Sequence, residues 1–365
     1  MTAGPSGTAG PRPPVSVVVP AYNGALTIIR TLESIAAQTY TPLELIVVDD
    51  ASTDGLPSLV ENFLAGESVP GRLLRHPTNE GLSRTLNDGW HAAQGELVLI
   101  IHQDIELLGT DWISRAVEGL AEQENVQVVT CHYGIPARAE LTFASRTFGL
   151  LRRQLYEAPA AGREFVTFTE FKCDLVRKAT LERLGGFPTD FRLAGEDIVV
   201  SYRIRQGGGR ILKAYDLKVV QRFEGTSGSV GGNLWKEYRF GMAFAGVLVA
   251  FRGFAFRGLD SSAYSRARSL HRASQPVVAV ALLVLLVAGI AFGWAWALVG
   301  LVAVVAVRYA FYAVQLWPDF RRSLPGRDRA LAETLGAALL GLVTDLVYPA
   351  GVVAGLARSA VGAPL

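Results

Sequence analysis

Short apolar runs alternate with amphipathic stretches along the first hundred residues of the chain. Four of the runs have the length of buried strands, and they cover residues 15–19, 43–48, 71–74 and 97–101. Residues 25–37 and 82–93 repeat apolar side chains at the spacing of one helical face. Strands that alternate with helices in this way predict an α/β fold with a doubly wound, mostly parallel sheet.

A long uncharged stretch lies in the C-terminal third of the chain, between Arg272 and Arg308. As one helix it would be about 50 Å long, whereas the hydrocarbon core of a bilayer is about 30 Å thick. The buried bundle of a soluble protein would also be apolar, but this uncharged length matches the membrane criterion directly. We therefore expect two transmembrane helices, at residues 277–292 and 294–312.

A third apolar stretch, residues 335–357, contains Asp345 and Pro349. It either crosses the membrane completely or forms a re-entrant or interfacial helix. A carboxylate that faces lipid at the bilayer centre costs about 2.5–3.5 kcal/mol on insertion scales. We therefore expect Asp345 to face neighbouring helices or a polar cavity.

Arginines flank the two predicted spans on one side of the membrane. They precede the first span and follow the second, at Arg252, Arg257, Arg266, Arg268, Arg272, Arg321, Arg322, Arg327 and Arg329. The positive-inside rule places both flanks in the cytosol. The sequence therefore predicts a multi-pass protein of the cytoplasmic membrane, with its α/β part in the cytosol.

Composition narrows the classes of protein further. Apolar residues make up 50% of the 365 residues and charged residues 19%, which excludes disorder for most of the chain. A net charge of +2 offers no basic field for nucleic acid, and two cysteines exclude a disulfide framework. We expect a disordered leader that is not a signal peptide (1–14), an α/β domain (15–230), an interfacial, amphipathic connector (231–275) and a membrane region with two or three transmembrane helices (276–365).

Polar clusters follow three of the four predicted strands. They occupy residues 20–24 (PAYNG), 49–55 (DDASTDG) and 102–104 (HQD). Because parallel strands end at the same edge of a sheet, the clusters should line one crevice. A single aspartate after a strand is often only a helix cap. Carboxylates gathered without basic partners favour a divalent cation or a sugar nucleotide as the ligand.

These segments resemble the nucleotide-binding half of the family 2 glycosyltransferases, which have the GT-A fold. The similar motifs are residues 16–23 (SVVVPAYN), 45–55 (LIVVDDASTDG), 79–81 (NEG), Asn87, Gly95 and 101–104 (IHQD). Residues 184–187 (LGGF) and 195–197 (GED) resemble the acceptor-side motif of that family. The sequence has neither a Walker A motif nor a GxGxxG motif.

The resemblance implies an inverting transfer of a sugar from a nucleotide-diphospho-sugar, with Mg²⁺ or Mn²⁺ as cofactor. Asp104 matches the last residue of the family's D-x-D motif and would bind the metal. His102 and Gln103 fill the other two positions of that motif and would contact the donor. The remaining donor-binding residues that the resemblance implies are Asp50 for the nucleobase N–H, Tyr22 for packing near the base, and Pro20 and Ala21 through their backbone groups.

On the acceptor side, the resemblance implies that Asp197 is the general base, with Glu196 as the neighbouring candidate. Both residues also begin a predicted helix, residues 198–205, whose dipole they would stabilise. The two roles are compatible. Asp54, in contrast, is expected to brace its loop or cap a helix rather than bind a ligand.

Two positions depart from the family's pattern. His102 stands where the family has the first aspartate of D-x-D, and its imidazole would touch the ribose or the metal, or bond to backbone. Gln221 stands where many relatives have a metal-binding histidine, so metal affinity would be lower. The next residue, Arg222, would pair with the diphosphate of the donor.

Together these features predict a membrane-anchored glycosyltransferase whose partners are a nucleotide-diphospho-sugar, a lipid-linked or glycan acceptor, and membrane lipids. Such an enzyme would make a glycolipid or a precursor of a cell-envelope polysaccharide on the cytosolic face. Transfer to a polyprenyl phosphate is a close alternative, because an anionic acceptor needs no strong base. The other alternative is a degenerate, non-catalytic membrane protein that binds sugar nucleotides.

Overall fold

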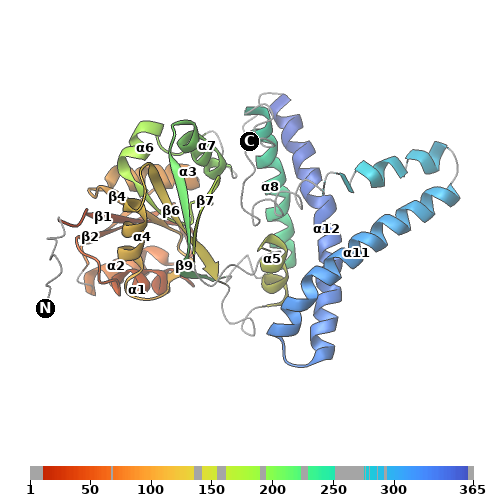
Figure 1. Ribbon diagram of the computed structural model, residues 1–365, viewed down its shortest axis with the longest axis horizontal. Helices are drawn as coiled ribbons and strands as arrows, with labels where there is room; N and C mark the ends of the chain where they lie inside the picture. Colours follow the sequence, from red (N-terminus) through yellow and green to blue (C-terminus); the bar gives the residue numbers. More distant parts are fainter. Residues whose placement is uncertain are drawn as a thin grey trace, which may run out of the picture.

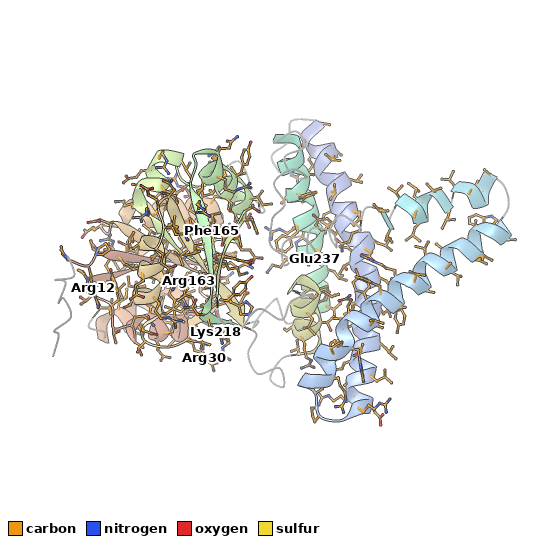
Figure 2. The ribbon with its side chains drawn as sticks, viewed as in Figure 1. Arg12, Arg30, Arg163, Phe165, Lys218 and Glu237 are labelled. Atoms are coloured by element: carbon orange, nitrogen blue, oxygen red, sulfur yellow. The ribbon has the colours of Figure 1, made fainter. Side chains whose placement is uncertain are left out.

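The structure is a computed structural model, and it describes residues 11–66, 69–134, 142–153, 162–189, 195–222, 229–250 and 275–360, apart from 276, 279, 286, 292 and 293. Most of the predicted leader and residues 251–274 of the predicted connector lie outside the described residues. Figure 1 shows an α/β part beside a group of long helices. Side chains crowd the α/β part and project outward from the more distant helices (Figure 2).

One sheet organises the α/β part. Its described strands, in spatial order, are β3 (Gly71–Arg75), β2 (Leu43–Asp49), β1 (Val15–Ala21), β4 (Leu97–Ile101), β8 (Cys173–Arg177), β6 (Val126–Gly134), β9 (Arg210–Gln221) and β5 (Ile105–Leu107), and β7 (Arg163–Val166) also pairs with β9. The four strands predicted from the sequence, β1 to β4, are all parallel, as predicted. The sheet becomes mixed where β8 runs antiparallel to β4 and β6.

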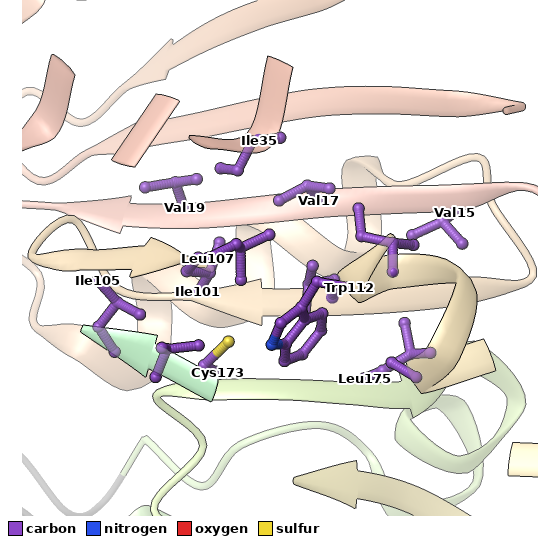
Figure 3. Packing of buried hydrophobic residues seen from close by; sticks show 14 of the residues in the cluster. Val15, Val17, Val19, Ile35, Ile101, Ile105, Leu107, Trp112, Cys173 and Leu175 are labelled. Atoms are coloured by element: carbon purple, nitrogen blue, oxygen red, sulfur yellow. The ribbon is translucent and has the colours of Figure 1, made fainter. Parts of the chain in front are cut away.

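Helices cover both faces of this sheet. Those on one face, called the α1 side, are α1 (Ile28–Ala36), α2 (Leu56–Gly66) and α4 (Trp112–Ala121), and those on the other, called the α3 side, are α3 (Leu82–Ala92), α6 (Lys178–Leu184) and α7 (Glu196–Gln206). Val17 and Ile101 point into the α1-side core (Figure 3), whereas Val18 and Ile100 point into the α3-side core. Because both faces are covered, the central strands are apolar throughout rather than alternating with polar residues.

Long helices follow the α/β part. They are α8 (Val230–Ala250), α11 (Trp294–Ser323) and α12 (Arg327–Ala360). Ala297–Pro318 and the whole of α12 are long and apolar enough to cross a membrane. The predicted span at residues 294–312 is helical, and α11 continues beyond it through Pro318.

The other two predicted membrane segments are also helical where the structure describes them. Residues 335–357 lie within α12, which continues through Pro349 as one helix. The predicted span at residues 277–292 contains a shorter apolar helix, Val280–Ala291. Two of the three apolar segments found in the sequence therefore lie in helices long enough to cross a membrane, whereas the described helix of the first segment is shorter.

Close backbone contacts join α8 to α12, and the two helices lie side by side in Figure 1. A Cβ atom on Gly241 would lie 2.1 Å from the carbonyl oxygen of Tyr348, and one on Gly355 would lie 2.5 Å from that of Met242. Residue numbers increase in the same direction along both helices at this contact, so α8 and α12 are parallel. Glycine permits such an approach, as it does between membrane helices.

Helix α5 (Phe143–Arg153), which lies between β6 and β7 in the chain, links the α/β part to the long helices. The guanidinium of Arg146 binds the carboxylate of Glu333 on α12 at 2.7 and 2.9 Å. Phe148 packs in the same apolar cluster as Tyr312 of α11. Helix α5 is therefore packed against the beginning of α12.

Asp345 is buried between α11 and α12, as predicted. The guanidinium of Arg308 binds its two carboxylate oxygens at 2.7 and 3.0 Å. The hydroxyl of Tyr312 donates a further hydrogen bond to it at 2.8 Å. These partners give both charges a counterpart inside an otherwise apolar pair of helices.

Candidate active site

Loops at the carboxyl edge of the sheet are fastened to one another by side chains. The amide of Gln103 accepts the backbone N–H of Tyr22 at 2.9 Å and donates to its carbonyl at 3.0 Å. The carboxylate of Asp54 accepts the N–H of Ala25 at 2.8 Å, so Asp54 braces the loop as predicted. The ring of Tyr22 is 47% exposed, which leaves it able to pack against a base.

Asp50 lies at the centre of a hydrogen-bond network beside this loop. Its buried carboxylate accepts the N–H of Glu80 at 2.7 Å and that of Gly81 at 2.9 Å. His76 lies 2.8 Å from the same carboxylate through Nδ1 and 3.1 Å from Asp88 through Nε2. A carboxylate has about four acceptor positions, so Asp50 can accept one further donor, such as the N–H of a nucleobase.

Asp104 is brought next to Gln221 by the antiparallel pairing of β5 with β9. Ile105 pairs with Gln221 in this ladder, and the amide of Gln221 donates to Oδ2 of Asp104 at 2.9 Å. The side chain of Arg222 binds Glu106 with two hydrogen bonds, at 2.6 and 3.0 Å. A contact between Arg222 and a diphosphate, as the sequence predicts, would require this ion pair to open.

His102 directly follows β4 and lies among charged residues. Its backbone N–H donates to the carbonyl of Lys172 at 2.8 Å, while its Nε2 atom is buried and has no hydrogen-bond partner among the described residues. Burial lowers the pKa of the imidazole to about 4, helped by the charges of Lys172 and Lys236 and opposed by that of Asp104. The ring is therefore neutral at physiological pH and offers a nitrogen lone pair. Since Lys236 belongs to α8, that helix borders the site.

The pair Glu196 and Asp197 begins α7, as predicted. Oδ1 of Asp197 accepts the N–H of Ile198 at 2.8 Å. Burial, and then the charges of Glu196 and Glu170, raise the pKa of Asp197 well above its usual value. Burial raises the pKa of Glu196 as well. A carboxylate whose pKa is shifted toward neutrality is suited to proton transfer.

Asn87 positions the turn that precedes this acidic pair. Its amide donates to the carbonyl of Phe187 at 2.8 Å and accepts the N–H of the same residue at 2.8 Å. A Cβ atom on Gly186 would lie 2.4 Å from Oδ1 of Asn87, and φ of Gly186 is +73°. Gly186 is therefore required by close approach and by its left-handed backbone, and Gly185, whose φ is also +73°, by its backbone alone.

Comparison with known proteins agrees with this geometry. Residues 16–185 match the family model described as Glycosyl transferase family 2. The chain contains a family 2 glycosyltransferase domain. Among solved structures, mannosyltransferase PcManGT from Pyrobaculum calidifontis, in complex with GDP-Man and Mn²⁺, is 25% identical with a TM-score of 0.56, covering 92% of this chain and 88% of that chain. The glycosyltransferase domain has the GT-A fold that the sequence predicts.

Curated relatives match about a third of the chain. The uncharacterized glycosyltransferase YibD of Escherichia coli (strain K12) is 30% identical over 118 residues, which are 32% of this chain and 33% of that protein. The GalNAc(5)-diNAcBac-PP-undecaprenol beta-1,3-glucosyltransferase of Campylobacter jejuni is 32% identical over 112 residues, 30% of this chain and 36% of that protein. The chain therefore spans about a third of the length of these curated relatives.

The glycosyltransferase domain offers few side chains that could bind a divalent metal. The described residues contain no group of three or more His, Cys, Asp or Glu side chains that could hold a metal ion. The carboxylate of Asp104 and the unpartnered Nε2 of His102 are the two groups that would hold one. Mg²⁺ in particular is commonly bound by one or two carboxylates together with substrate phosphates and water, so this small set is sufficient.

Several contacts of the glycosyltransferase domain have no signal in the sequence. His76 looks like an ordinary structural histidine, yet it bonds to Asp50. Lys172 and Glu170 belong to none of the family's motifs, yet their charges act on both His102 and Asp197. The roles predicted for the individual site residues remain predictions, and the contacts above are compatible with them.

Proposed function

We propose that the chain is an inverting glycosyltransferase that moves a sugar from a nucleotide-diphospho-sugar to a membrane-associated acceptor on the cytosolic face. The observation that carries this proposal is the arrangement of carboxylates around His102. Asp104, held by Gln221, follows His102 directly in the chain, while the charge of Lys172 acts on both His102 and Asp197. The carboxylate predicted to bind metal and the carboxylate predicted to accept the proton thus lie near one shared cation, Lys172.

The donor half of the site supports binding of the nucleotide. Asp50 retains an acceptor position for the nucleobase, and the exposed ring of Tyr22 offers a surface on which the base packs. Pro20 and Ala21 would contribute backbone groups, although the carbonyl of Ala21 already accepts the N–H of Asp50 at 2.8 Å. A divalent cation bound by Asp104 would neutralise the negative charge that grows on the leaving diphosphate.

Asp197 performs the proton transfer in this proposal. The acceptor hydroxyl oxygen attacks the anomeric carbon from the side opposite the diphosphate, and its proton passes to Oδ2 of Asp197. The bond between the anomeric carbon and the diphosphate oxygen breaks, and its electron pair leaves with the diphosphate. Oδ1 already accepts the N–H of Ile198 at 2.8 Å, which favours Oδ2 as the oxygen that takes the proton.

A lipid-linked acceptor is supported by the position of α8. This helix packs on α12, which is apolar enough to cross a membrane, and it carries Lys236, whose charge reaches His102. The site therefore borders the helices that would hold it at the membrane surface. The ion pair between Arg146 and Glu333 joins α5, which follows β6 in the chain, to the beginning of α12. The relative from Campylobacter jejuni is named for an undecaprenol-linked substrate.

A donor screen tests this function. The full-length protein in nanodiscs is incubated with UDP-, GDP- and dTDP-sugars, a lipid extract as acceptor and Mn²⁺ or Mg²⁺, and released nucleoside diphosphate is measured. We expect release from a subset of donors, and loss of at least about 100-fold in Asp104→Asn, the scale of removing one group that stabilises transition-state charge. Absence of release from every donor would contradict catalysis and favour a protein that only binds sugar nucleotides.

A further inference from the structure

Lys172 directly precedes β8 and lies opposite His102 in the sheet. Ile101 pairs with Cys173 in the antiparallel ladder of β4 and β8, and the N–H of His102 donates to the carbonyl of Lys172. Residues opposite one another in such a ladder place their side chains on the same face. Ile101 and Cys173 point into the α1-side core, so the next pair, His102 and Lys172, points to the α3 side, where α7 begins with Asp197.

The backbone before Lys172 has an unusual conformation. Phe171 has φ of +48°, the left-handed region, although it is bulky and only 1% exposed. A regular strand would point Phe171 to the same side as Cys173, but its ring lies in the α3-side core, edge-on to Phe187 with centroids 5.2 Å apart. Non-glycine residues are rare in this region and cluster at functional sites.

This left-handed residue separates two charged side chains that pair with each other. The ammonium of Lys172 binds the carboxylate of Glu170 across it, and the Lys172 side chain remains 29% exposed. The charge of Lys172 also opposes the raised pKa values of Glu196 and Asp197. Lys172 is thus a partly accessible cation between the predicted metal-binding and base residues.

The diphosphate of a donor requires positive charge at this place. His102 stands where the family motif has a carboxylate, so Asp104 is left as the one carboxylate of that motif for a metal. Arg222, the cation expected to bind the diphosphate, is held by two hydrogen bonds to Glu106, and neither side chain is more than 20% exposed. The side chain of Lys172 is more exposed than that of Arg222. His102, which lies opposite Lys172 in the sheet, fills the first position of the D-x-D motif.

We propose that Lys172 binds the diphosphate of the nucleotide-sugar donor, and that Glu170 holds its ammonium until the donor arrives. This inference rests on the proposed function. The diphosphate displaces the Glu170 carboxylate from Lys172 and forms a charge-assisted hydrogen bond in its place. As the glycosidic bond breaks, the fixed ammonium stabilises the negative charge that develops on the leaving oxygen.

Nucleotide binding without turnover tests the proposal. Isothermal titration calorimetry of the full-length protein in detergent, with UDP, GDP and dTDP and the corresponding monophosphates, is carried out with Mn²⁺ and again with excess EDTA. In EDTA, Lys172→Met should weaken binding of the preferred diphosphate at least ~10-fold, about 1.4 kcal/mol, and reduce the preference for diphosphate over monophosphate. Lys172→Arg keeps the charge and should stay within about threefold of the wild type.

Two further variants complete the test. Glu170→Gln removes the competing carboxylate and should tighten diphosphate binding about two- to fivefold. Lys218→Met, at an exposed lysine of β9 (Figure 2), is the matched control and should bind like the wild type. Thermal unfolding of each variant shows whether it is folded, and if Lys172→Met does not fold, Lys172→Arg and Glu170→Gln still decide the question.

The outcomes separate this inference from the proposed function. If the wild type binds none of the three diphosphates, the proposed function fails and this inference fails with it. If the wild type binds one of them and Lys172→Met binds it equally well, the inference alone is overturned. Weaker binding by Glu170→Gln would also overturn it, since Glu170 would then assist the diphosphate rather than compete with it.

Discussion

Replacing Asp197 with asparagine removes the predicted base and preserves its shape. The N–H of Ile198 donates to Oδ1 at 2.8 Å, and the amide oxygen of asparagine can accept this bond in the same place. The amide cannot take the proton of the acceptor hydroxyl. General-base catalysis contributes about 10²–10⁴-fold, so we expect kcat to fall at least ~100-fold, about 2.7 kcal/mol, with unchanged affinity for the nucleoside diphosphate.

The pH profile provides a second measure of the same residue. Burial, together with the charges of Glu196 and Glu170, raises the pKa of Asp197 well above 3.8. The base acts only when ionised, so kcat/KM should be lost as pH falls through this raised pKa, at higher pH than an ordinary aspartate would require. Glu196→Gln removes one repulsive charge, lowers the pKa of Asp197, and should move this acidic limb to lower pH.

Steady-state kinetics with the donor found in the screen measure both effects. Asp111→Asn, at an exposed position directly before α4, is the matched control and should keep the wild-type rate. A rate for Asp197→Asn within a few-fold of the wild type would refute the base assignment. That result would favour an anionic acceptor such as a polyprenyl phosphate, which needs no base.

The remaining predictions concern stability. Arg308→Ala and Asp345→Ala should each destabilise the protein by about 3–5 kcal/mol, because each leaves a buried charge unpaired. Thermal unfolding in detergent should show that the double variant loses less stability than the sum of the two single variants. Additive losses would contradict the pairing. Burial raises the pKa of Asp174 to about 6, so the folded protein holds a proton that the unfolded chain releases at lower pH. Stability should therefore fall as pH rises between about 4 and 6. Asp174→Asn should reduce this dependence of the melting temperature on pH. An unchanged dependence would contradict the raised pKa of Asp174.

Local patterns predicted the parallel half of the sheet and the apolar helices. The run at residues 97–101 became β4, and the amphipathic residues 25–37 contain α1. Their period and flanking turns are local properties of the chain. Strands such as β6 and β9 were not predicted, because their positions depend on partners distant in sequence. Pro318 also failed to end α11, since packing in the helical group overrides a local preference.

The difference between local patterns and contacts with distant residues also explains which site residues the sequence indicated. Asp104, Asp50 and Asp197 follow strand ends or begin a helix, so motif and position indicate them. The pairing of Arg222 with Glu106 depends on the register of β5 with β9, and no local pattern determines that register. Lys172 lies opposite His102 because β8 runs antiparallel to β4, and no local pattern determines that pairing.

Transfer of the sugar itself tests the central claim most directly. Inverted membrane vesicles that contain the full-length protein are given the preferred donor labelled with ¹⁴C in its sugar, and label is measured in the organic extract and in water. We expect label in the lipid extract, dependent on a divalent cation and strongly reduced in Asp104→Asn and Asp197→Asn. Donor consumption that leaves all label in water as free sugar, or lipid labelling that is equal in both variants, would contradict the account.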